Sequence, residues 1–224
     1  MPNWCSCNLT VTGPSLDYFY DAMKGEFSFQ KFVPEPEELR NICSGSMTID
    51  GVTYRQWREI PNLPQEEFDK LNWQEQFQNT TQIGIPDDEV ERLVKLYGSA
   101  NRYDWHCANW GTKWDACEAE IDDMSDQSFS VRFDSAWSPP SQFLETVSAL
   151  FPTLHFQLAY AEGGACFYGV DAYKAGERLD ESFCDGEFWK PADEQEEEDP
   201  EDYEDNLTEE CRQHINYYGL GTGG

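Results

Sequence analysis

The stretch NWGTKWDA, residues 109–116, places an amide, an ammonium and a carboxylate side chain beside two tryptophans. If the segment is a strand, side chains alternate, and both tryptophans lie on one face with the polar groups on the other. The polar row would then be Asn109, Lys113 and Asp115. Together with Trp137, this row could bind a partner or a small ligand, or carry enzymatic chemistry. The alternative is that both tryptophans are buried against the helices, as large aromatic residues commonly are, while the charged pair lies in solvent.

Cysteine and histidine could also provide chemistry, in a zinc site or as a nucleophile with its base. Adjacent His106 and Cys107 would point to opposite faces of a strand, and Cys5 and Cys7 form C-x-C rather than the usual C-x₂₋₄-C. Cysteine catalysis would need a histidine positioned by a third group, and the chain has three histidines in all. The EGGACFYG segment is typical of a hairpin turn. Cys117 is a further candidate zinc ligand, but we expect no metal site, no catalytic residues and no cofactor.

Charge restricts the partners of the protein. The 224 residues include 44 acidic and 15 basic side chains, a formal net charge of −29, so phosphate backbones are repelled and direct nucleic-acid binding is disfavoured. Such a chain can engage the basic groove of a nucleic-acid-binding protein. Its N-terminus lacks the pattern of a signal peptide, and no apolar run is long enough to span a bilayer. We expect a cytoplasmic protein without a membrane partner.

The acidic residues are concentrated near the C-terminus, where residues 180–210 hold 16 acidic side chains and one basic one. Such composition is typical of a disordered, solubilising segment, and we expect residues 180–224 to be a largely disordered tail. The same carboxylates could instead imitate a phosphate backbone and bind lysine and arginine. The carboxylates of this candidate partner-binding set are Glu196, Glu197, Glu198, Asp199, Glu201 and Asp202.

Hydrophobic periodicity predicts the elements that position these groups. Alternation predicts strands at 3–12, 128–137, 154–160 and 166–172 and a further strand near 109–121; spacing of i, i+3, i+4 predicts helices after Ser15 and after Ser138. The order strand, helix, insertion, strand, strand, helix, strand, strand predicts an α+β, ferredoxin-like split βαβ sheet with two packed helices, over residues 1–179. Residues of about 34–100 are expected to be a mostly helical insertion, with a helix at 87–97.

Five motifs in series resemble one protein family. They are MPNWCSCNLTVTG at 1–13, FVPEPEEL at 32–39, NWGTKWDA at 109–116, FDSAWSPP at 133–140 and FPTLHFQLAYAEGGACFYG at 151–169. In these the chain is similar to the YubB-type proteins with a ferredoxin-like domain, which bacteriophages and conjugative plasmids carry. The resemblance implies an accessory protein of a mobile element, of a kind for which no general enzymatic activity is established. We therefore expect a protein that binds and inhibits a host defence component of the anti-CRISPR or anti-restriction type; a phage regulator or scaffold is the alternative.

Overall fold

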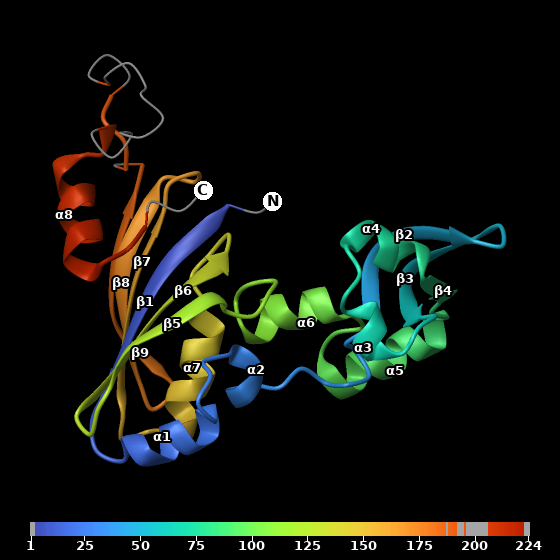
Figure 1. The fold of residues 1–224 in the computed structure, drawn as a ribbon, viewed down its shortest axis with the longest axis horizontal. Helices are drawn as coiled ribbons and strands as arrows, with labels where there is room; N and C mark the ends of the chain where they lie inside the picture. Colours follow the sequence, from blue (N-terminus) through green and yellow to red (C-terminus); the bar gives the residue numbers. More distant parts are fainter. Residues whose placement is uncertain (1–2, 187, 192–194, 196–205, 222–224) are drawn as a thin grey trace. The chain divides into compact units, whose positions relative to one another are not determined.

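The structure, a computed structural model, describes residues 3–186, 188–191, 195 and 206–221. The chain divides into two compact units (Figure 1). Met1–Pro34 and Asn109–Gly224 form the first, here called the sheet unit, and Glu35–Ala108 form the second, here called the insertion unit. None of the described helices is long and apolar enough to cross a membrane.

The sheet unit contains a six-stranded antiparallel sheet in the order β5-β6-β1-β7-β8-β9. Four of these strands, in the order β7-β1-β6-β5, have the arrangement of a ferredoxin-like fold, with α1 after β1 and α7 between β6 and β7. The predicted fold class is therefore confirmed, and β8 and β9 extend its sheet at one edge. The strands are β1 (Trp4–Thr12), β5 (Cys117–Met124), β6 (Ser128–Ala136), β7 (His155–Glu162), β8 (Phe167–Lys174) and β9 (Glu177–Asp185).

Three helices cover one face of this sheet: α1 (Leu16–Met23), α2 (Phe29–Phe32) and α7 (Ser141–Leu150) (Figure 1). Alternate residues of β1 are buried on this face, as the sequence predicts. Aromatic rings fill the space between the layers, and Phe29 of α2 lies 4.4 Å from Phe143 of α7, measured between ring centroids. Burial of this aromatic area fixes the helices on the sheet.

The opposite face is covered in part by α8 (Glu209–Tyr218) (Figure 1). Apolar residues from the helix and its flanks pack on β7 and β8, and the Asn8 side-chain amide donates to the Tyr218 carbonyl at 2.7 Å. The expectation of a largely disordered tail from residue 180 is thus wrong for β9 and for residues 206–221. Burial of apolar side chains offsets the chain entropy there despite the many charges. The buried residues of this cluster are Ala159, Ala161, Phe188, Leu207, Cys211, Ile215 and Leu220.

The insertion unit has its own three-stranded antiparallel sheet, in the order β2-β3-β4, which the prediction of a mostly helical segment missed. Asp50 and Gly51 both have positive φ, 50° and 81°, and close the hairpin between β2 and β3. The predicted helix at 87–97 is confirmed as α5. The elements are β2 (Ile42–Ile49), β3 (Val52–Pro61), α3 (Gln65–Phe68), α4 (Trp73–Gln78), β4 (Thr80–Gly84), α5 (Asp87–Tyr97) and α6 (Arg102–Asn109), whose last residue begins the sheet unit.

Candidate functional site

The NWGTKWDA segment is a loop, and its prediction as a strand is wrong. Helix α6 ends at Asn109, β5 begins only at Cys117, and Gly111 has a φ of +85° that breaks any strand alternation. Trp110 is buried, and its indole N–H donates to the Val33 carbonyl at 2.9 Å. Trp114 is instead 40 % exposed. Of the two tryptophans, one therefore belongs to the core and the other to the surface.

Asp115 does not belong to an outward polar row, because its carboxylate binds the beginning of α2. It accepts hydrogen bonds from the Ser28 hydroxyl at 2.6 Å and the Phe29 backbone N–H at 2.5 Å. Further donors are the N–H groups of Gln30, at 3.4 Å, and Ala116, at 2.8 Å. Unpaired N–H groups at a helix start favour a carboxylate there. Asp115 therefore has a structural role in joining the loop to the helix layer.

The loop also interlocks with the second motif, FDSAWSPP, at the end of β6. The Ser138 hydroxyl donates to the Gly111 carbonyl at 2.8 Å, and the Thr112 hydroxyl donates to the Ala136 carbonyl at 2.9 Å. At the start of α7, the Phe143 N–H donates to the Trp110 carbonyl at 3.3 Å. Successive loop residues thus contact the chain between β6 and α7, so two motifs far apart in sequence form one surface.

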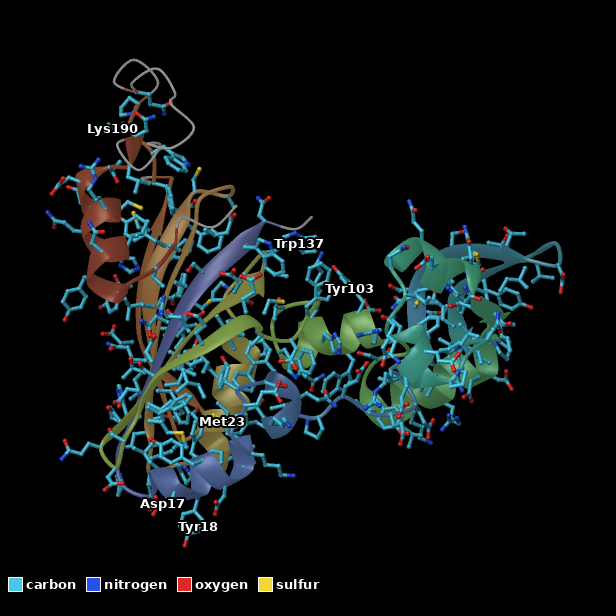
Figure 2. The ribbon with its side chains drawn as sticks, in the orientation of Figure 1. Asp17, Tyr18, Met23, Tyr103, Trp137 and Lys190 are labelled. Carbon is cyan, nitrogen blue, oxygen red and sulfur yellow. The ribbon has the colours of Figure 1, made fainter. Side chains whose placement is uncertain are left out.

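That surface carries a tryptophan cluster, defined here as Trp4, Trp114, Trp137 and Lys113. The Lys113 ammonium lies 3.8 Å from the Trp137 ring centroid and 4.1 Å from that of Trp114, and the Trp4 ring lies 5.6 Å from Trp114. Both distances to the ammonium are typical of cation–π contacts. Trp137, labelled at the end of β6 in Figure 2, is 49 % exposed. Tryptophan side chains are usually buried, and exposed indole rings are typical of binding surfaces.

The backbone of Trp137 is strained, with a φ of +72° in the left-handed region. For a bulky residue this conformation costs on the order of 1–2 kcal/mol. The Trp137 N–H donates to the Asn3 carbonyl at 3.0 Å, which helps to hold the turn. This conformation ends β6 at Ala136 and leaves the Trp137 indole in solvent. Strained residues of this kind concentrate at functional positions.

One carboxylate, that of Asp134, lies beside Trp4 on the α8 side of the sheet. Trp4 pairs with Ala136 and Ser6 pairs with Asp134, so Asp134 and Trp4 lie diagonally on one face of neighbouring strands. Burial raises the pKa of Asp134, and the negative charge of Glu118 raises it further. The Asp134 carboxylate is therefore in a place where a cation would be favourable.

The predicted site residues are only partly brought together. Lys113 and Trp137 are in contact, whereas Asn109 ends α6 and Asp115 binds α2. Sequence reasoning included Trp137, the Trp of FDSAWSPP, but it missed Trp4 and the exposure of Trp114, for which the local sequence carries no signal. The six carboxylates of the tail lie outside the described residues: Glu196, Glu197, Glu198, Asp199, Glu201 and Asp202.

A second polar cluster lies in the core of the sheet unit. The Asp171 carboxylate is fully buried and pairs with Arg178 at 2.6 Å, and the Tyr173 hydroxyl donates to it at 3.1 Å. Burial raises the pKa of Tyr173 to about 12. These groups satisfy one another and stabilise the β8–β9 edge. Within the described residues, no group of three or more histidine, cysteine or acidic side chains could hold a metal ion.

Comparison with known proteins places the chain in a family. Residues 109–204 match the family model described as a ferredoxin-like domain in Api92-like protein. The chain is 30 % identical over 103 residues to the protein YubB of Escherichia coli strain K12, covering 45 % of this chain and 70 % of YubB. The crystal structure of protein api92 from Yersinia pseudotuberculosis is similar with a TM-score of 0.45 and 14 % identity, over 81 % of this chain and 98 % of that one. The protein thus belongs to the same family as YubB, and its ferredoxin-like domain is of the Api92-like kind.

Proposed function

We propose that this protein is a non-enzymatic accessory protein of a phage or plasmid that binds and inhibits a host defence component in the host cytoplasm. The inhibition would be of the anti-CRISPR or anti-restriction type, and the target would be a protein or complex with a basic nucleic-acid-binding surface. The resemblance of the five motifs to proteins of mobile elements supports the choice of a defence component. Nucleic acid itself and membranes are not proposed as partners.

Charge is the observation that carries this proposal. The sheet unit contains 30 acidic and eight basic side chains, whereas the insertion unit contains 14 and seven. Both edge strands present acidic residues to solvent, Glu118, Glu120 and Asp122 on β5 and Glu177, Asp180 and Glu181 on β9. Acidic edges also prevent sheets from pairing with one another, which accounts for part of this pattern. The excess of acidic side chains in the sheet unit goes beyond that need, and a negative field steers basic partners toward the protein.

The test uses purified restriction endonucleases and CRISPR nuclease complexes. We expect the full-length protein to inhibit DNA binding by at least one of them, in competition with DNA and less strongly as salt rises, because salt screens exposed charges. A β9 variant with Glu177→Gln, Asp180→Asn and Asp185→Asn should inhibit several-fold less. A variant with Glu37→Gln, Glu66→Gln and Glu67→Gln removes equal charge from the insertion unit and serves as its control.

Two results would contradict the proposal. One is the absence of inhibition for every nuclease tested, together with no nucleic-acid-handling protein captured from host lysate. The other is inhibition that does not change with salt. The contribution of the tail is measured by converting its six carboxylates to amides. Deleting residues 193–210 would be a poor substitute, because it removes the buried Leu207 and the Thr208 hydroxyl that caps α8.

A further inference from the structure

The tryptophan cluster has a property that a purely acidic surface lacks, since its rings already bind a cation. The Lys113 ammonium contacts two indole rings, at 3.8 Å and 4.1 Å. Both rings remain 40 % or more exposed, so part of each lies open to a partner. An indole binds guanidinium as well as ammonium, and the planar guanidinium can also stack on it.

Asp134, beside Trp4 of the cluster, adds a carboxylate to the same surface. Asp134 lies diagonally from Trp4 on the same face, and Glu118 directly follows Cys117, the β5 residue that pairs with Asp134. A guanidinium on the rings would reduce the repulsion between these two acids. Arginine binds carboxylates in a planar, bidentate manner that lysine cannot reproduce.

We propose that Trp114 and Trp137, with Asp134 and Glu118, form a binding site for arginine side chains on the surface of a basic protein partner. Charge complementarity selects this occupant, because the surrounding unit has 30 acidic and eight basic side chains. Lys113 lies over both rings and competes with the arginine for them. This inference rests on the proposed function, and it identifies where on the protein the basic partner is anchored.

The first experiment compares two peptides of equal length and charge, one of arginine and one of lysine, by calorimetry on the full-length protein. We expect the arginine peptide to bind several-fold more tightly. Substituting Trp114→Ala or Trp137→Ala should weaken arginine binding about 3- to 10-fold, the range for a partly desolvated cation–π contact. Lysine binding should change less. Tyr18→Ala, at a side chain 71 % exposed on the outer side of α1, is the matched control and should change neither.

The second experiment predicts stronger rather than weaker arginine binding, and it leaves both indole rings in place. Lys113→Met frees the ring faces and should strengthen arginine binding by more than Lys174→Met does. Lys174 is exposed at the end of β8, and its substitution removes the same charge. Equal gains in the two variants would mean that only net charge matters, which would overturn the arginine site.

The outcomes distinguish this site from the proposed function. If both peptides bind equally and the tryptophan substitutions have no effect, the arginine site is wrong, while salt-dependent inhibition of a nuclease can still hold. If neither peptide nor any nuclease binds, the proposed function fails with it. Tight binding of a single-stranded oligonucleotide that is lost in the Trp137→Ala variant would also overturn the proposal, because the rings would then stack on bases.

Discussion

Replacing Asp115 by alanine tests whether this residue is structural, as its contacts indicate, or part of a partner-binding row. Its carboxylate holds the Ser28 hydroxyl at 2.6 Å and the Phe29 N–H at 2.5 Å. A hydrogen bond to a charged group contributes about 1.5–3 kcal/mol, so losing these two in a half-buried place should cost about 3 kcal/mol. Asp115→Asn keeps one acceptor oxygen, and we expect it to cost about half as much.

Urea denaturation followed by tryptophan fluorescence measures this cost. With a slope of about 1–3 kcal/mol per molar urea, the midpoint of the transition should fall by about 1 M or more in Asp115→Ala. Hydrogen exchange should also become faster at residues 29–33, whose amides lie in and after α2. Asp122→Ala is the control, because Asp122 pairs with exposed Arg132 at 2.7 Å, and such a pair contributes about 1 kcal/mol or less. An Asp115→Ala variant with unchanged stability and impaired partner binding would refute the reasoning and restore the polar row.

Three further predictions concern the sheet unit. Arg178→Ala leaves the buried Asp171 carboxylate without its 2.6 Å partner and should lower the free energy of unfolding by about 3–5 kcal/mol, measured by urea denaturation. Burial lowers the pKa of His214 below the usual 6.5, so the neutral ring stabilises the docked position of α8. This stabilisation is fully present above pH 6.5 and is lost as the pH falls through the folded-state pKa. Hydrogen exchange of the α8 amides should therefore become faster at low pH in the natural protein but not in the His214→Phe variant. Gly111→Ala places a Cβ 3.1 Å from the Ser141 nitrogen at a φ of +85°, and should lower the thermal midpoint by several degrees, about 1–2 kcal/mol in free energy; an unchanged midpoint would contradict the strain.

The ferredoxin-like core was predictable because its pattern is local. Strand β1 alternates buried and half-buried residues over its whole length, and α7 places Phe143, Leu144 and Val147 on one buried face. Each element thus carries the period of its own structure. The expected organisation of the sheet follows from these periods and from the order of the elements.

The loop at 110–116 was not predictable by the same means. Trp110 and Trp114 are four residues apart, a spacing that fits a strand, a helix or a turn equally well. Tertiary contacts determine the conformation of the loop. Gly111 has a φ of +85°, and its carbonyl accepts a hydrogen bond from the Ser138 hydroxyl, which belongs to a segment elsewhere in the chain. The binding of α2 by Asp115 is likewise a long-range contact.

Other missed elements had local signals in the sequence. Thr208 caps α8, its first turn is acidic, Cys211 and Ile215 are buried one turn apart, and Gly219 ends the helix. The acidic composition of the preceding segment hid this pattern. In the insertion unit, Asp50-Gly51 is a strong hairpin signal between two β-rich runs.

The interlock between the loop at 110–116 and the end of β6 has a consequence for protein engineering. Thr112 binds Ala136, Gly111 binds Ser138 and Trp137 binds Asn3, so three separated segments form one structural cassette. In a chimera with another member of the family, a graft of one segment alone would lose the donors and acceptors that the others supply. Only a joint transplant of all three would carry the indole surface intact to a new scaffold.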